Sequence, residues 1–371
     1  MSEYQYYEFR TINRQLTAAQ RTAVDKLSSH GDTTATSFSV EYSWGDFKHD
    51  PDEVLANYFD IFFYIANWGS VELKFCYPKE LIDLRALEPY CIDEEELAIE
   101  TKTIGDHIIL SFASHAEGDG AWIEGEGMLD DLVGLYTQIS QGDRRIFYLA
   151  WLGAAERAYE YSDYLDEEML EPPVPPMLGT LAPALSAFVE LFGIDQDLIA
   201  TAAQGSAQAE AAAGIDVTQA LAALSKEESI DFLQRFLDGE AHVDVKLKQR
   251  LGLLPTAEEY GPTGTRTLGE LLAARDEIKR VRTAAAAAQK AAKQRTEMAA
   301  LAAQGDKPWQ EVETLIAEKK TAAYSDAAKL LRKLSELAEE QGQSKQFQQR
   351  LEAIRTKYSR RPALIAELRK L

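Results

Sequence analysis

Residues 71–77, Val71-Glu72-Leu73-Lys74-Phe75-Cys76-Tyr77, carry an apolar side chain at every second position. Because successive side chains of a strand point to opposite faces of a sheet, this period of two predicts a β-strand with one buried face. Further strands are expected at residues 4–12, 33–42, 97–102 and 107–112. A turn at Gly105-Asp106 would join the last two as a hairpin.

Helices are expected between these strands. Thr17 can cap a helix over residues 17–27, and Asp50-Pro51 provides a cap and a proline for the first helical position of another. The second helix is expected to continue to about Ala66 and, being apolar on several sides, to be buried. A short helix is predicted over residues 78–87. Because these elements lack a regular βαβ rhythm, they predict an α+β fold rather than a doubly wound sheet.

From Met128 onward the pattern is helical to the C-terminus. The stretches Glu-Pro-Pro-Val-Pro-Pro at 171–176 and Gly-Pro-Thr-Gly-Thr at 261–265 are predicted to be linkers. We therefore expect an α+β N-terminal domain followed by mainly α-helical middle and C-terminal domains. The predicted domains are an acidic α+β domain ending in helices at 1–171, a small helical domain at 177–260 and a basic, alanine-rich helical array at 266–371.

The last predicted domain opens with a long helix over residues 267–304, whose heptad seam is almost entirely alanine. Alanine buries little area, so such a helix favours close approach to other helices over a large core of its own. Further helices are expected after it, at residues 309–340, 344–358 and 362–371.

Charge divides the chain near residue 265. Residues 1–265 contain 47 acidic and 17 basic side chains, a net charge of −30, whereas residues 266–371 contain 14 and 22, a net of +8. This change of sign indicates a separate contact element in the C-terminal region. The total of −22 argues against binding of nucleic acid or acidic lipid by the whole surface, but it is compatible with a local basic face.

Composition also predicts the compartment. The two cysteines, Cys76 and Cys91, are too few for a disulfide framework. No signal peptide is recognised at the start, and the longest apolar run, residues 61–66, is too short to cross a bilayer. We therefore expect a cytoplasmic protein that does not contact a membrane.

Motifs for catalysis, cofactors and metals are not found. The sequence has neither a Gly-x-Ser-x-Gly elbow nor a phosphate-binding glycine loop, and its histidines are not paired at metal-ligand spacing. His115, Glu117 and Asp119 could together hold a metal, but a solvated acidic loop is the favoured interpretation. We predict no catalytic residue, no cofactor and no metal site, and favour a protein that is not an enzyme.

Two tryptophans leave an enzymatic alternative open. Trp44 and Trp68 each precede a glycine at the end of a predicted element, where an indole ring can close a core or form a binding surface. Core closure is favoured, because no basic residues are interleaved with them. A pocket beside Trp44 and Trp68 is nevertheless the place where a site without a sequence motif is expected.

The basic helix carries the main binding signal. Five cationic residues recur along it at spacings that can place them on one face: Arg275, Lys279, Arg282, Lys290 and Lys293. They could form a solvated face, dock on the acidic body of the chain, or bind an acidic protein or a nucleic acid. Protein is favoured over nucleic acid, because the acidic body would repel phosphate.

Several segments resemble those of a group of uncharacterised bacterial proteins. The similar residues are 1–9 (MSEYQYYEF), 42–48, 66–69, 88–91, 148–152, 309–316 and 361–365. The C-terminal segment is also similar to the tail of some bacterial proteins with a SWIM zinc finger, whose genes often neighbour those of the group. The resemblance implies a SWIM zinc finger protein as partner. It implies no zinc site, because the Cys-x-Cys and Cys-x-His pattern of the finger is absent.

These observations together favour a non-catalytic adaptor or assembly factor that binds another protein through its helical C-terminal region. A nucleic-acid-associated accessory factor that uses the basic helix is the first alternative. An enzyme with a motif-less site in the N-terminal domain is the second.

Overall fold

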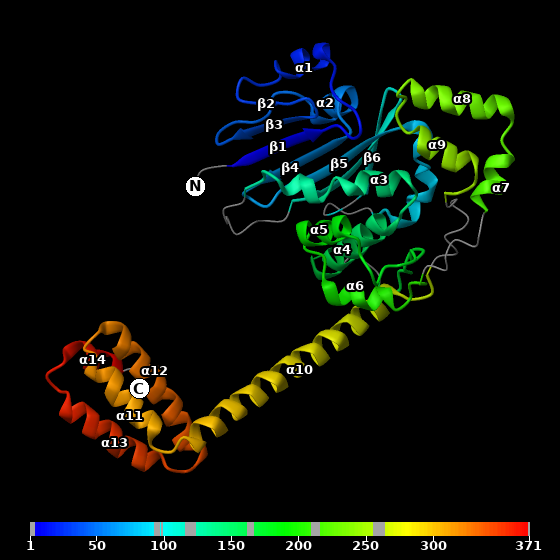
Figure 1. The fold of residues 1–371 in the computed structure, drawn as a ribbon. Helices are drawn as coiled ribbons and strands as arrows, with labels where there is room; N and C mark the ends of the chain where they lie inside the picture. Colours follow the sequence, from blue (N-terminus) through cyan, green and yellow to red (C-terminus); the bar gives the residue numbers. More distant parts are fainter. Residues whose placement is uncertain are drawn as a thin grey trace. The chain divides into compact units, whose positions relative to one another are not determined.

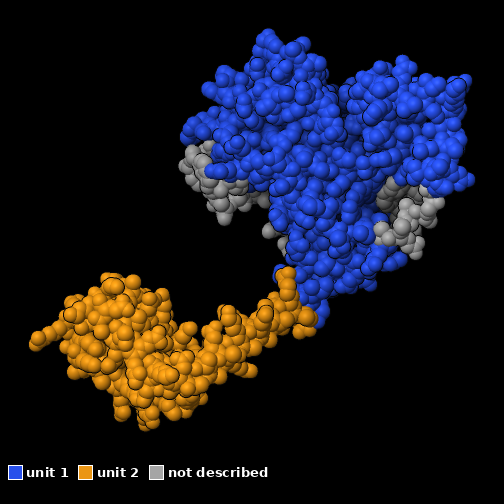
Figure 2. All heavy atoms as spheres, in the orientation of Figure 1, with its two compact units in different colours: residues 1–279 blue, residues 280–371 orange. Residues whose placement is uncertain are grey.

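The computed structural model describes residues 4–92, 97, 99–115, 124–161, 167–208, 216–254 and 264–369. The chain divides into two compact units, residues 1–279 and residues 280–371 (Figure 2). The division falls within one helix, α10 (Leu268–Ala303). Each unit is described below by itself.

The N-terminal unit contains one antiparallel sheet of seven strands in the order β2-β3-β1-β4-β5-β7-β6 (Figure 1). The strands are β1 (Gln5–Arg10), β2 (Asp32–Thr33), β3 (Ser37–Tyr42), β4 (Ile61–Ala66), β5 (Val71–Pro78), β6 (Ile99–Ile104) and β7 (His107–Ser114). The alternating stretch that begins at Val71 is β5, as predicted, and it pairs with β4 and β7. The predicted hairpin joins β6 to β7, with Gly105 at a φ of 55° in the turn.

The apolar run at 61–66 is a strand, so the prediction of a helix continuing to Ala66 is wrong. Helix α2 (Pro51–Tyr58) starts at its Asp50 cap as expected but ends before Asp60. Strand β4 then lies between β1 and β5. Because helices cover both faces of this central position, both sets of side chains are buried and the strand lacks the polar alternation of an exposed face.

Two hydrophobic clusters lie on the two faces of the sheet. Helices α1 (Ala18–Val24) and α2 cover one face, where Phe9, Phe38, Leu55 and Phe62 are buried together. The other face is covered mainly by α3 (Gly134–Ser140), α4 (Arg145–Tyr161), α5 (Pro183–Leu191) and α6 (Gln196–Ala203). The helical region expected from Met128 onward begins with a short 3₁₀ turn, Met128–Asp131, followed by α3.

The compact units differ from the three predicted domains. A single hydrophobic cluster contains Tyr4 of the sheet, Phe188 of α5 and Leu272 of α10. Pro172 and Pro175 are buried, so the predicted linker at 171–176 runs along this core. Much of the second predicted linker lies outside the described residues. The predicted order, a sheet followed by helices, is confirmed.

Three short helices complete the N-terminal unit before α10. They are α7 (Val217–Ala222), α8 (Lys226–Leu237) and α9 (Val243–Arg250). Helix α8 begins at a capping box, in which Ser225 accepts from the backbone of Glu228 and the Glu228 carboxylate accepts from the backbone of Ser225. Val245 of α9 joins the main core, so α9 is the helix that attaches this group to the sheet.

The C-terminal unit is an all-helical array. Its helices after α10 are α11 (Lys307–Ala317), α12 (Thr321–Glu340), α13 (Ser344–Lys357) and α14 (Pro362–Leu368). Their core includes Val312, Ile316, Leu331, Leu351 and Leu364. The region predicted as one helix over 309–340 is two helices, divided where Lys319 has a φ of 57°. None of the described helices is long and apolar enough to cross a membrane.

Candidate functional site

The pocket predicted beside Trp44 and Trp68 has no counterpart among the cavities found in the described residues. Trp44 follows β3 and Trp68 lies in the β4–β5 turn, on either side of β1, because Tyr42 and Ala66 both pair with Gln5. Their side chains are 72% and 40% exposed, and neither lines any of the cavities described below. The two tryptophans therefore neither close a core nor form a pocket with the surrounding residues that the structure describes.

Arg275 does not lie on an exposed cationic face, as was predicted for it. It is 9% exposed and forms ion pairs with Glu156 of α4 and Asp276. These contacts fix the first turns of α10 to the N-terminal unit. Lys279 and Arg282 lie in the following, exposed part of the helix.

Lys290 and Lys293, in contrast, line a groove of about 920 Å³ between α10 and α12, which we call the α10–α12 groove. Its other basic residues come from α12 and were missed in the sequence, where only the first long helix was considered. They are Lys329, Arg332 and Lys333. Their spacing of three and four residues was the signal that they share a face.

The α10–α12 groove joins these charges to an apolar floor. Met298, 5% exposed, lies in the floor with Leu301 and Leu330. Lys333 lies 3.9 Å from Glu297, and the remaining acidic residues of the lining are Glu311 and Glu336.

Three of the groove's cations are exposed and available. Lys290, Lys293 and Arg332 form no ion pair with any residue in the described ranges. A positively charged rim around an apolar floor can hold a ligand that is itself amphipathic and acidic.

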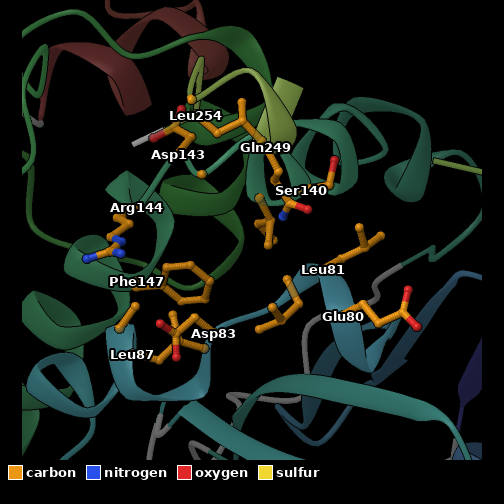
Figure 3. A pocket seen from close by; sticks show the side chains of 15 residues that line it. Glu80, Leu81, Asp83, Leu87, Ser140, Asp143, Arg144, Phe147, Gln249 and Leu254 are labelled. Carbon is orange, nitrogen blue, oxygen red and sulfur yellow. The ribbon is translucent and has the colours of Figure 1, made fainter. Parts of the chain in front are cut away.

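A second cavity, of about 390 Å³, lies in the N-terminal unit (Figure 3). Leu81, Leu87 and Phe147 form its apolar wall, while Gln249 and Leu254 close another side. Its carboxylates already have cationic partners: Asp143 lies 2.6 Å from Arg145, Glu80 lies 3.3 Å from Lys246, and Asp83 lies 3.3 Å from Arg85. The acids of the cavity are neutralised in this way, and its lining also contains Arg144.

The hydroxyl of Tyr136 contacts a histidine and the backbone of Cys76, whose thiol packs in the hydrophobic cluster on the opposite face of the sheet. The hydroxyl of Tyr136 donates to the carbonyl of Cys76 at 3.2 Å and lies 3.1 Å from Nε2 of His242. Burial raises the pKa of the Cys76 thiol to about 12 and lowers the pKa of His242. A thiol with so high a pKa is a poor nucleophile. The contacts of Tyr136 with His242 and with the backbone of Cys76 are therefore interpreted as structural.

Metal sites find no support in the described part of the chain, where no group of three His, Cys, Asp or Glu side chains could hold an ion. The predicted alternative ligands Glu117 and Asp119 lie outside the described residues. Comparisons with protein-family models, curated proteins and solved structures find no match. The function is therefore argued from geometry.

Proposed function

We propose that the chain is a non-catalytic cytoplasmic adaptor or assembly factor that binds a partner protein through its C-terminal helical region. The observation that carries this proposal is the α10–α12 groove, where Lys290, Lys293 and Arg332 surround an apolar floor. An amphipathic helix can place apolar anchors in such a groove while acidic side chains at its edges meet the rim. The proposed occupant is therefore an amphipathic helix with acidic flanks.

The lining of the groove favours protein over nucleic acid. Glu297, Glu311 and Glu336 share the lining with the five cations. These carboxylates disfavour any anionic ligand, but a phosphate backbone has no apolar side chains to place on a floor such as that formed by Met298, whereas an amphipathic helix has them. A helix with both apolar and acidic positions satisfies both parts of the groove.

The sequence resemblance suggests which partner to test first. Because the C-terminal segment resembles the tail of SWIM zinc finger proteins, we propose a protein of that kind as the partner. The two cysteines are both free, as the proposed cytoplasmic location requires.

The experiment compares the full chain with a Lys290→Glu/Lys293→Glu variant. The ligand is a leucine–glutamate amphipathic peptide of about 18 residues, roughly five helical turns. We expect charge reversal to weaken binding, followed by fluorescence anisotropy, by about tenfold or more. Lys345→Glu is the matched control, because Lys345 is an exposed lysine of α13 outside the groove.

Affinity purification from the native host tests the same residues with natural ligands. A SWIM zinc finger protein recovered with the wild type and with Lys345→Glu, but lost with the double variant, would support the proposal. Equal peptide affinity in all three chains would contradict it. Recovery of nucleic acid in place of protein would favour the accessory-factor alternative.

A further inference from the structure

Helix α8 is amphipathic, yet none of its residues is buried. Its apolar residues Ile230, Leu233, Phe236 and Leu237 are 53%, 63%, 68% and 83% exposed. They recur every three or four positions, the spacing of a helix face that packs against another element. Side chains of this size scattered singly on a surface need no explanation, but a continuous face of them marks an interaction site.

The exposed face continues onto the neighbouring helix. Val217 and Leu221 of α7 are 50% and 45% exposed. Together with the four apolar residues of α8, they form what we call the α7–α9 apolar surface. A cavity of about 510 Å³ opens in it, lined by residues of all three helices that include Leu221, Phe232 and Leu247. The surface is therefore a hollow with apolar walls rather than a flat patch.

Polar contacts hold α8 in place without covering its apolar face. Glu228 in its first turn lies 2.8 Å from Arg250 of α9, and Arg235 lies 2.7 Å from Glu240 beyond its end. The capping box of Ser225 and Glu228 closes the N-terminus. Because the helix is already formed and attached, a ligand would bind it without paying for its folding.

We propose that the α7–α9 apolar surface docks a basic amphipathic helix of a partner protein. Charge selects this occupant. Asp244, which lies 3.6 Å from Lys248, lines the cavity, while Glu227 lies one turn before Ile230 and Asp238 directly follows Leu237. Residues 216–254 contain seven acidic and five basic side chains, a net charge of −2, within a region, 1–265, whose net charge is −30.

The same charge disfavours a second copy of the chain as the occupant. Two copies meeting through this surface would bring two acidic regions together, which is unfavourable at physiological ionic strength. A helix with lysine or arginine beside its apolar anchors would instead be attracted to the acidic residues at the edges of the hollow.

This inference is separate from the proposed function. The α7–α9 apolar surface lies in the N-terminal unit, whereas the α10–α12 groove lies in the C-terminal unit. The two sites are expected to prefer helices of opposite charge. An adaptor that has both could hold two different partners.

The experiment uses the full chain and a leucine–lysine amphipathic peptide of about 18 residues. Binding is followed by fluorescence anisotropy for the wild type and for Leu233→Ser/Phe236→Ser. We expect the variant to bind about tenfold or more weakly, because it removes two apolar contacts without changing charge. Val281→Ser is the matched control, since Val281 is an apolar residue of α10 that is 53% exposed and belongs to the other compact unit.

Folding and specificity are checked in the same series. Neither substituted side chain is buried, so circular dichroism and thermal unfolding should match the wild type. Equal affinity of wild type and variant would overturn the proposal, because binding would then follow the general acidity of the chain. A wild-type dimer that the double substitution dissociates would also overturn it in favour of a second copy.

Discussion

Nη2 of Arg266 lies 2.6 Å from Oε1 of Glu171, although the two residues are 95 positions apart in the sequence. Nε of Arg266 lies 2.8 Å from the other carboxylate oxygen, so the pair is bidentate. The hydroxyl of Tyr148 donates to the same carboxylate, and Arg266 also donates to the carbonyls of Thr201 and Ala202. The ion pair thus connects α4, the proline segment, α6 and the start of α10.

Removing the cation of this pair is expected to destabilise the N-terminal unit strongly. Glu171 is 1% exposed, so Arg266→Ala would leave a buried carboxylate without its cation, at a cost of about 3 kcal/mol. Urea unfolding followed by tryptophan fluorescence measures the change.

A matched control separates burial from charge. Arg250 pairs with Glu228 at 2.8 Å, but their side chains are 53% and 36% exposed, so Arg250→Ala should lower stability far less than Arg266→Ala. Equal losses of unfolding free energy in the two variants would show that the pair of Glu171 and Arg266 stabilises the fold no more than an exposed ion pair does.

The same ion pair explains why the predicted domain boundaries differ from the compact units. Proline-rich and glycine-rich stretches indicate where a helix is interrupted, and residues 171–176 do lie between α4 and α5, although α4 already ends at Tyr161. Such stretches carry no information about which residues they contact in the folded protein. The carboxylate of Glu171 and the arginine that follows the second stretch are complementary, but charge alone does not identify such a pair among 61 acidic and 39 basic residues.

Local patterns predicted the strands on both sides of β4 but not β4 itself, the central strand of the sheet. Residues 71–77 alternate because one face of β5 is less buried than the other, with Glu72 and Lys74 partly exposed. The run at 61–66 has no alternation, and a short apolar run can be a buried helix or a buried strand. The pairing of β4 with β1 and β5 decides between them, and this is information that the whole sheet supplies.

The candidate site was only partly predictable for a related reason. The sequence analysis singled out Lys290 and Lys293 because they lie close together in a helix that is unusually rich in alanine and basic residues. Arg275 has the same spacing, but its pairing with Glu156 depends on α4, which is more than 100 residues away. Predicting the residues on the α12 side of the groove would have required knowing that α12 packs beside α10.

Acid should weaken the fold through His242. Burial lowers the pKa of His242 below its ordinary value of 6.5. Between that ordinary value and the lowered one, the unfolded chain binds a proton that the folded chain does not, so stability falls as the pH falls through this window. We expect His242→Gln to flatten the decline in melting temperature between about pH 7 and about pH 5.

The contact of His242 with Tyr136 makes the slope, rather than the absolute stability, the informative quantity. Substitution changes the 3.1 Å contact at every pH and therefore shifts the whole curve. Above about pH 8 His242 is neutral in both the folded and the unfolded chain, so the difference in melting temperature between variant and wild type there measures this constant offset. Parallel curves over the whole range would rule out the histidine as the source of acid sensitivity.

The two cysteines should differ sharply in reactivity. Cys76 is 3% exposed in β5, and burial raises the pKa of its thiol to about 12. Cys91 is exposed, although partial burial and the charge of Glu88 also raise the pKa of its thiol. We expect a thiol reagent at neutral pH to modify Cys91 slowly and Cys76 not at all.

Mass spectrometry of the labelled protein locates the modification. Cys91→Ser should abolish labelling of the folded chain, whereas the wild type unfolded in urea should react at both cysteines. Rapid modification of Cys76 in the folded protein would show that the sheet opens around it.

Met298 is expected to link the stability of the C-terminal unit to the α10–α12 groove. It is the buried residue, 5% exposed, that follows a long exposed part of α10, and it forms part of the groove floor. Met298→Ala removes this packing and should cost about 2 kcal/mol, which faster amide hydrogen exchange in α12 would report. Met298→Ala should also weaken binding of the leucine–glutamate peptide, because the apolar anchors of the peptide lose part of the groove floor.

Met177→Ala is the matched control, since Met177 is 39% exposed in the N-terminal unit and should change stability by less than about 0.5 kcal/mol. If Met298→Ala leaves both exchange and peptide affinity unchanged, α10 does not depend on this contact and the proposed groove loses its floor.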